Sequence, residues 1–251
     1  MRTLVVVPTY DEAATVERAV EGVLACPGDA GRAEVLVVDD ASPDGTGAVA
    51  DRLARRDERV HVLHRPRKSG LGSAYRDAFR WGLSRGYDSL CQMDADLSHD
   101  PADLPRLLRA LRGADLVVGS RYVPTGDVAD WSPARVALSR GANHAVRLLT
   151  GLPVRDATSG FRAFRRTVLD TLALDSVRSD GYAFQVEMAL RAWLEGFRVV
   201  EVPIVFVERR AGSSKLTWAV TAEAAGRLPV WALRWPRHAP SAHPRSVARR
   251  A

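Results

Sequence analysis

Carboxylate side chains recur directly after three short apolar segments of this sequence. They lie in the segments Pro8–Glu12, Asp39–Thr46 and Asp94–Asp96. Carboxylates gathered in one place repel one another, and a hard divalent cation bound by their oxygen atoms relieves that repulsion. In an Asp-x-Asp sequence both carboxylates point to the same side, because alternate residues of an extended chain share a face. Asp94 and Asp96 therefore predict a divalent metal site, of the kind that usually holds substrate phosphates.

A second group of candidate residues is mainly cationic and lies in the second half of the chain. Its members are Arg121, Arg135, Ser139, Arg209 and Lys215. The planar guanidinium fork of arginine donates two parallel hydrogen bonds to a phosphate. A phosphate that acts as the nucleophile is already ionised near neutral pH, so it needs cationic guides rather than a general base. We assign the neighbouring Arg140 to solvated surface instead.

The elements that must position these residues alternate between strands and helices. Short β-rich runs occupy 4–7, 35–38, 60–63, 89–93 and 116–119, and segments with helical spacing occupy 12–25, 46–56, 73–85 and 101–112. The strands are continuously apolar, which is typical of strands covered on both faces. This order predicts an α/β fold with a mostly parallel sheet and helices on both faces. In such sheets, ligands bind beyond the carboxyl ends of the strands.

Two common phosphate-binding motifs are excluded by their spacing. No GxxxxGK[ST] sequence is present, and Gly70-Leu71-Gly72 lacks the third glycine of a dinucleotide fingerprint. Each acidic segment alone is also a good turn sequence, so it is their joint placement that favours a site. Residues 68–72 fit either a substrate-facing loop or a tight connection between a strand and a helix.

Composition limits the class of protein. The chain has 251 residues, of which 46% are hydrophobic and 26% charged, so it can bury a full core. Cys26 and Cys91 lie in or beside apolar runs, which predicts buried thiols, a reducing compartment and no zinc site. We find no signal peptide and no apolar run long enough to span a membrane.

The excess positive charge is concentrated near the C-terminus. Five arginines and no acidic residue lie in 234–251, and the net charge of the whole chain is +6. The rest is nearly neutral and its strand ends are acidic, which disfavours nucleic acid as a partner. The basic tail 236–251 is either solvated disorder or an arm that binds anionic surfaces.

The ordered series of motifs resembles one family of enzymes. VVVPTYDE, VVDDASPDGT, KSGLGSAYRDAF, MDADLSHDP and GSRY occur in the order found in the inverting nucleotide-sugar transferases of glycosyltransferase family 2, within the polyprenol-phosphate mannosyltransferase (dolichol-phosphate mannose synthase) group. The similarity spans about residues 2–225. It implies a GT-A fold, a GDP-mannose donor, a polyprenyl monophosphate acceptor and a divalent metal, Mg²⁺ or Mn²⁺.

The resemblance also assigns roles to individual residues. The guanosine pocket would be lined by Pro8, Tyr10, Glu12, Val38, Asp39 and Asp40, and the metal-binding motif matches Asp94, Ala95 and Asp96. Ser98 stands where relatives usually have glutamine, and its shorter side chain would reach the ion only through a water molecule or a backbone shift. Phosphates of donor and acceptor would be bound by Arg121, Arg135, Ser139, Arg209 and Lys215. Arg209 is chosen over Arg210, which is assigned to solvated surface, because FVERRAGSSKL matches the FxxRxxGxSKL spacing of the family.

Two further acidic residues have structural interpretations. The resemblance offers Asp156 as a base, as in relatives that glycosylate hydroxyls, but here Asp156 is expected to orient Arg162 or to cap a turn. The helix that follows Asp180 is expected to be mostly core, and its Glu187 to brace one of the phosphate-binding arginines.

The C-terminal part raises the question of membrane attachment. We expect a catalytic domain over 1–215, an amphipathic helix over 216–235 and the basic tail over 236–251. Trp218, Trp231 and Trp235 fit either an interfacial helix or packing against the domain. Adding the basic tail favours peripheral attachment to the cytoplasmic face of a membrane, with an integral membrane protein as a further candidate partner.

The sequence therefore predicts an enzyme that transfers mannose from GDP-mannose to a polyprenyl phosphate with inversion. A related transferase that uses UDP-glucose is the nearest alternative. A non-catalytic nucleotide-binding module is the alternative from another class, and the cationic set disfavours it because simple nucleotide binding would not require it.

Overall fold

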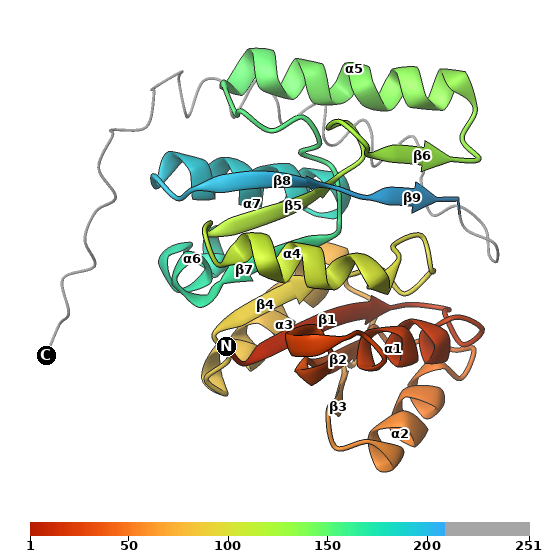
Figure 1. The fold of residues 1–251 in the computed structure, drawn as a ribbon. Coiled ribbons are helices and arrows are strands. Elements are labelled where there is room, and N and C mark those ends of the chain that lie inside the picture. The colour runs from red at the N-terminus through yellow and green to blue at the C-terminus, as the bar shows by residue number, and fades with distance from the viewer. Residues whose placement is uncertain (209–251) are drawn as a thin grey trace, which may run out of the picture.

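Valine-rich segments form the central strands of a seven-stranded sheet in the computed structural model, which describes residues 1–208 (Figure 1). The sheet order is β3-β2-β1-β4-β7-β5-β8, and β7 is the strand that runs antiparallel to both neighbours. The strands are β1 (Thr3–Thr9), β2 (Glu34–Asp39), β3 (Val60–His64), β4 (Ser89–Gln92), β5 (Leu116–Ser120), β7 (Arg162–Arg165) and β8 (Val199–Pro203). The predicted α/β class and mostly parallel sheet are confirmed.

Helices cover both faces of this sheet (Figure 1). They are α1 (Val16–Leu24), α2 (Thr46–Arg56), α3 (Leu71–Ser84), α4 (Leu104–Leu111), α5 (Pro133–Thr150), α6 (Arg166–Thr171) and α7 (Gly181–Leu194). A separate two-stranded parallel ladder joins β6 (Asp127–Ala129) to β9 (Val205–Val207). The sequence does not predict this ladder. No helix within residues 1–208 is both long and apolar enough to cross a membrane.

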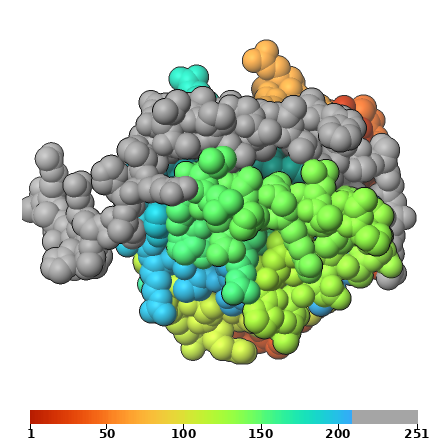
Figure 2. Space-filling view, turned by 90° about the horizontal axis from the view of Figure 1, so that it is seen from above, coloured from red at the N-terminus to blue at the C-terminus, as the bar shows by residue number. Residues whose placement is uncertain are grey.

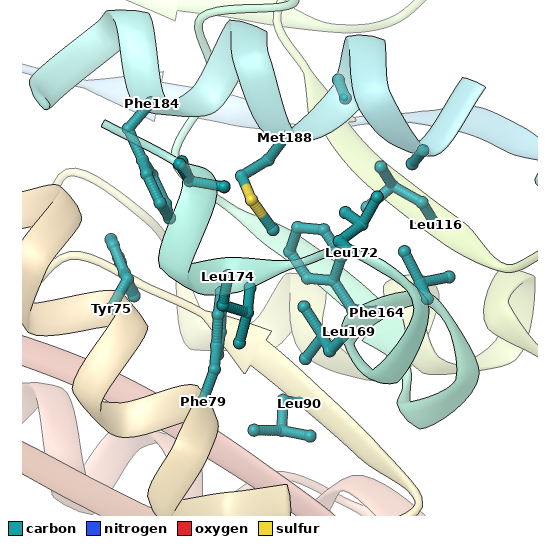
Figure 3. Packing of buried hydrophobic residues seen from close by; sticks show 14 of the residues in the cluster. Tyr75, Phe79, Leu90, Leu116, Phe164, Leu169, Leu172, Leu174, Phe184 and Met188 are labelled. Atoms are coloured by element: carbon teal, nitrogen blue, oxygen red, sulfur yellow. The ribbon is translucent and has the colours of Figure 1, made fainter. Parts of the chain in front are cut away.

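The core consists of two layers separated by the sheet. Successive residues of β1 enter opposite layers, Leu4 and Val6 on one side and Val5 and Val7 on the other. This alternation follows from the strand geometry, in which neighbouring side chains point to opposite faces. One layer packs α3, α6 and α7 against the sheet (Figure 3), and the other packs α1, α2 and α4.

Both cysteines are buried free thiols, as predicted. The expected helix over 216–235 and the basic tail over 236–251 lie outside the described residues, as do Arg209, Arg210 and Lys215.

Candidate active site

A cavity of about 480 Å³ opens at the carboxyl ends of the strands. It is lined by nine of the residues predicted from the sequence, namely Pro8, Tyr10, Glu12, Asp40, Asp94, Ala95, Asp96, Arg121 and Arg135. Three of the five non-glycine residues with positive φ within 1–208 lie in the loops that follow β1, β2 and β4, at Asp11, Ala41 and Leu97. A positive φ is uncommon for residues other than glycine, and such residues are often found at functional sites. The tight turns bring the acidic segments into one place.

Asp94 and Asp96 lie at the end of β4 and both line the cavity. The hydroxyl of Ser98 donates to Asp96 Oδ1 over 2.6 Å, and the Ser98 backbone N–H donates to the same oxygen over 3.0 Å. Ser98 does not line the cavity, and its side chain is only 1% exposed. Ser98 therefore contacts Asp96 through two hydrogen bonds and does not itself face the cavity.

His99 and Gly160 complete the surroundings of Asp94. The Asp94 backbone N–H donates to His99 Nδ1 over 3.2 Å, and the His99 ring stacks on Phe161 with 5.1 Å between centroids. A side chain on Gly160 would begin 3.4 Å from both Asp94 carboxylate oxygens. The glycine thus leaves the space beside that carboxylate open to the cavity.

The side of the cavity formed by β1 and β2 carries an aromatic ring and a buried carboxylate. The Lys68 ammonium lies 3.5 Å from the centroid of the Tyr10 ring, which is a cation–π contact. Asp40 accepts hydrogen bonds from Arg65 over 2.6 Å and from the backbone N–H of Gly70 over 3.2 Å. Asp40 therefore fixes the loop that carries Lys68, and this ties the loop to the end of β2.

Val38 and Asp39, also predicted for the nucleotide pocket, do not line the cavity. Val38 is fully buried in the layer that contains α3. Asp39 accepts the Ser42 backbone N–H over 3.2 Å and lies 3.5 Å from His64. Asp40 lies just beyond the end of β2, where the cavity opens, whereas Val38 lies within the strand and faces the core. Asp39 faces the opposite side, toward the start of α2.

The loop 68–72 lines the cavity and also makes the tight connection into α3. Lys68, Gly70 and Leu71 line the cavity, and the same loop starts α3. Gly70 has φ of +90°, and a side chain there would collide with the Asp180 carboxylate. Asp180 also accepts the backbone N–H of Gly72, so it satisfies a donor in the first turn of α3.

Arg121 is held in a buried ion pair with Asp156. Its Nε and one terminal nitrogen each donate to the Asp156 carboxylate over 2.7 Å, and its backbone N–H donates over 2.9 Å. Arg121 is 4% exposed and Asp156 is fully buried. Burial alone would raise the pKa of Asp156, but the charge and hydrogen bonds of Arg121 hold it below its ordinary value of 3.8.

This pair corrects the expectation for Asp156. The carboxylate binds Arg121, not Arg162, because the turn after α5 returns to the end of β5. Arg162 is fully buried and instead donates to the carbonyl groups of Ala157 and Ser159, over 2.6 and 2.8 Å. Burial lowers the pKa of Arg162 to about 10.

Arg135 and Ser139 share α5 but face different partners. Arg135 lines the cavity, pairs with Glu208 and lies 3.9 Å from the centroid of the Trp131 ring. Ser139 accepts a hydrogen bond from the Tyr122 hydroxyl over 2.6 Å and does not line the cavity. The structure thus brings Arg135, and not Ser139, to the site.

Glu187 does not brace a cavity arginine among the described residues, contrary to expectation. It pairs with Arg191 one turn later on α7 and accepts a hydrogen bond from Ser179. Glu187 is only 3% exposed, and a buried carboxylate needs a charged or hydrogen-bonding partner. Arg191 meets this need because residues four apart are neighbours on a helix.

Sequence reasoning missed several residues that line the cavity. They are His99, Trp131, Asp180, Tyr182, Gln185 and Phe206. Asp180 precedes a helix that the sequence predicts to be mostly core, so the sequence gives no separate signal for a place in the cavity. The β6–β9 ladder brings the segments of Trp131 and Phe206 together, so that their rings meet with centroids 5.5 Å apart. The sequence gives no signal for this long-range pairing.

Comparison with known proteins identifies the family. Residues 4–173 match the model of glycosyl transferase family 2. The chain belongs to this family. A polyprenol monophosphomannose synthase of Mycolicibacterium smegmatis is 50% identical over 236 residues, which cover 93% of this chain and 88% of that relative. An undecaprenyl-phosphate mannosyltransferase of Micrococcus luteus is 48% identical over 238 residues, with coverage of 94% and 96%.

Solved structures of glycosyltransferases share the fold. Glucosyl-3-phosphoglycerate synthase of Mycobacterium tuberculosis, in complex with phosphoglyceric acid, superposes with a TM-score of 0.70 at 19% identity, covering 92% of this chain and 80% of that one. The mannosyltransferase PcManGT of Pyrobaculum calidifontis, in complex with GDP-Man and Mn²⁺, gives 0.65 at 21% identity, with coverage of 95% and 66%. The predicted GT-A fold is confirmed, and this family 2 member is a glycosyltransferase.

Proposed function

We propose that this enzyme transfers mannose from GDP-mannose to a polyprenyl monophosphate with inversion at the anomeric carbon. The observation that carries the proposal is the placement of two carboxylates, Asp94 and Asp96, and of the cations Lys68 and Arg135 around one cavity. Such a cavity suits a nucleotide diphosphate and an anionic acceptor together. The names of the two relatives support mannose as the sugar and a polyprenyl phosphate as the acceptor.

The donor set fits a hard divalent cation. Asp94 and Asp96 both line the cavity, and the space beside Asp94 is kept open by Gly160. Within residues 1–208, no cluster of three or more acidic, histidine or cysteine side chains forms a complete metal site. Two protein carboxylates with substrate phosphates and water are the usual ligands of Mg²⁺ in such enzymes. When bound, the ion would neutralise charge that develops on the leaving diphosphate.

The other carboxylates of the cavity support an acceptor that needs no general base. Asp40 is bound by Arg65, Glu208 pairs with Arg135, and Asp180 accepts backbone N–H groups. Glu12 accepts a hydrogen bond from the Thr15 hydroxyl over 3.1 Å. In the proposed reaction an acceptor phosphate oxygen forms the new bond to the anomeric carbon, and GDP departs with the electron pair of the broken bond. The residues of the cavity would raise the rate by positioning the two substrates and by stabilising the charge that develops during transfer.

On the donor side we propose that Pro8, Tyr10, Glu12 and Asp40 surround the nucleoside. We propose that Arg135, with Arg209 and Lys215 from outside the described residues, binds phosphate groups. Arg121 already donates to Asp156 through two nitrogens, so its proposed role is to bind phosphate through the donors that remain.

UDP-glucose is the second candidate donor. It is favoured by the structural likeness to a glucosyl-3-phosphoglycerate synthase that was solved with UDP-glucose and Mn²⁺. That likeness, at 19% identity, concerns the fold, whereas the relatives named for mannose are near 50% identical. GDP-mannose is therefore the donor to test first.

The deciding experiment measures transfer of radiolabelled sugar into an organic-extractable polyprenyl phosphate. GDP-mannose and UDP-glucose are compared, each with Mg²⁺, with Mn²⁺ and with chelator. We expect metal-dependent incorporation from GDP-mannose alone. Incorporation from UDP-glucose alone would overturn the donor, and incorporation from neither would overturn the proposed acceptor or reaction.

We also propose that the enzyme works peripherally at the cytoplasmic face of a membrane, where its lipid acceptor would lie. The amphipathic segment 216–235 and the basic tail 236–251 support this proposal by their composition. Deletion of 236–251 should weaken binding to anionic liposomes at physiological salt, and unchanged binding would refute the role of the tail.

A further inference from the structure

Gln185 carries a buried side-chain amide in the wall of the cavity. The residue lies in the second turn of α7, lines the cavity and is only 2% exposed. Within residues 1–208, neither Oε1 nor Nε2 of this amide has a hydrogen-bond partner. Buried polar groups of native proteins are almost always hydrogen-bonded, so an exception requires an explanation. The function proposed above gives this amide no role.

The backbone around Gln185 is fixed by the buried guanidinium of Arg162. Arg162 donates to the Gln185 carbonyl over 2.5 Å and to the Ser159 carbonyl over 2.8 Å. One side chain thus ties α7 to the segment that precedes β7. Beside Gln185, the Phe184 ring stacks on Tyr75 of α3 with 5.8 Å between centroids (Figure 3). The turn of α7 that carries the amide is therefore held against two neighbouring elements.

The sheet order places Gln185 between the two ends of the cavity. The residues proposed to surround the nucleoside follow β1 and β2, and Arg121 follows β5. β4 and β7 lie between these strands, with Asp94 and Gly160 near their cavity ends. On the side of Arg121 the cavity is also lined by Arg135 of α5, a helix whose green surface lies at the front when the molecule is viewed from above (Figure 2).

The middle of the cavity is where the transferred sugar must lie. In the proposed reaction this sugar joins the diphosphate to the incoming oxygen of the acceptor, so it lies between the nucleoside end and the cationic end. Gln185, Ser159 and Gly160 line the cavity between those ends. A sugar hydroxyl both donates and accepts hydrogen bonds, and an amide offers two donors and an acceptor oxygen. The amide of Gln185 therefore matches a pair of hydroxyl groups.

We propose that the Gln185 amide binds hydroxyl groups of the transferred sugar and thereby selects the donor. This inference rests on the proposed function, because it takes a nucleotide sugar as the occupant of the cavity. A phosphate group suits the amide less well, since it would accept from Nε2 but leave Oε1 facing negative charge. A donor that lacks the matching hydroxyl would leave the amide buried and unpaired, which is the physical basis of the selection.

The test compares the wild type with Gln185→Leu on GDP-mannose and on the four analogues that each lack one hydroxyl of the mannose. The readout is kcat/KM for sugar transfer to polyprenyl phosphate. In the wild type, at least one analogue should be about 10–100-fold poorer than GDP-mannose, because it leaves the amide unpaired. Q185L should use GDP-mannose about 10–100-fold less well and should use that analogue within about threefold of GDP-mannose.

Two measurements separate this role from a structural one. Leucine removes polar atoms that have no partner in the described chain, so Q185L should keep or raise the melting temperature. Calorimetric binding of GDP with Mn²⁺ should be unchanged in Q185L, because GDP lacks the mannose. If Q185L does not fold, Gln185→Met repeats the comparison with an unbranched side chain of similar size.

Gln92→Leu is the matched control. Gln92 on β4 is also a fully buried amide without a hydrogen-bond partner among residues 1–208, but it does not line the cavity. Q92L should therefore discriminate among the analogues as the wild type does. Equal loss of discrimination in Q92L and Q185L would overturn the assignment to Gln185.

Other results would also overturn the inference. One is a Q185L enzyme that rejects the same analogue as strongly as the wild type does. Another is a wild type that uses all four analogues within about threefold of GDP-mannose. A third is a Q185L protein in which the melting temperature falls by more than about 5 °C and GDP binding is lost together with transfer, which would assign Gln185 a structural role.

Failure of the proposed function is recognised from the wild type alone. If the wild type transfers glucose from UDP-glucose and no mannose, the proposed donor fails, and the same comparison with deoxy analogues of UDP-glucose decides the role of Gln185. If it transfers neither sugar, the proposed function and the inference both fail. If it transfers mannose and Q185L keeps the selection, the inference alone fails.

Discussion

The buried ion pair between Arg121 and Asp156 permits a quantitative test of what holds the cavity wall in place. The substitution Asp156→Asn keeps the size of the side chain but removes its charge. One amide oxygen can still accept a hydrogen bond, whereas the amide nitrogen would face a guanidinium N–H, so that donor would meet donor. Arg121, which is 4% exposed, would keep its charge without a carboxylate partner. Removing one partner of a buried ion pair costs about 3–5 kcal/mol.

We therefore expect urea unfolding to give a free energy of unfolding about 3–5 kcal/mol lower for D156N. The melting temperature should fall by about 6–20 °C, at about 2–4 °C per kcal/mol for a chain of this size. The matched control is Glu17→Gln, which removes an exposed pair with Arg56 at 3.0 Å. That substitution should cost less than about 1 kcal/mol. If the free energy of unfolding falls by the same small amount in both variants, the buried pair does not hold the cavity wall in place.

The pH dependence of the same pair has a definite sign. The pKa of Asp156 is lower in the folded state than its ordinary value of 3.8, so the unfolded chain binds the proton first as pH falls. The stabilisation is therefore complete above the unfolded pKa and is lost as pH falls through the folded pKa. The stability difference between wild type and D156N should stay constant from about pH 8 to about pH 5 and shrink only in stronger acid. A difference that shrinks near neutrality would contradict this assignment.

Three further substitutions test the cavity itself. Asp96→Asn should abolish sugar transfer, a loss of at least about 10³-fold, with an unchanged melting temperature, and near-normal transfer would remove the metal assignment. Ser98→Ala deletes the 2.6 Å hydrogen bond to Asp96, so the metal concentration for half-maximal rate should rise about 10–100-fold, while saturating metal restores most of the rate. A fall in the rate at saturating metal with no change in metal affinity would contradict that role. Gly70→Ala places a side chain at φ of +90° against the Asp180 carboxylate and should cost about 1–3 kcal/mol in urea unfolding, whereas Gly28→Ala, also at positive φ but with nothing within 4 Å, should cost less.

The sequence by itself determined the elements of the first 120 residues and the position of the acidic site. Continuous apolar runs and helical spacing are local signals, and the carboxyl ends of parallel strands must meet at one edge of the sheet. Placing Asp40, Asp94 and Asp96 around one cavity required only the order of strands and helices. The motifs also indicated the family, because their order along the chain is preserved.

Only the tertiary structure decided which charged groups are partners. Asp156 binds Arg121, 35 residues away, and not Arg162, six residues away, because β7 enters the sheet antiparallel between β4 and β5. No local pattern specifies that insertion. The same limit applies to α5, whose apolar residues have ordinary helical spacing in the sequence. Whether an apolar stripe faces the core or solvent depends on what packs against the helix, and for α5 the buried face is the one with Asn143 and Thr150.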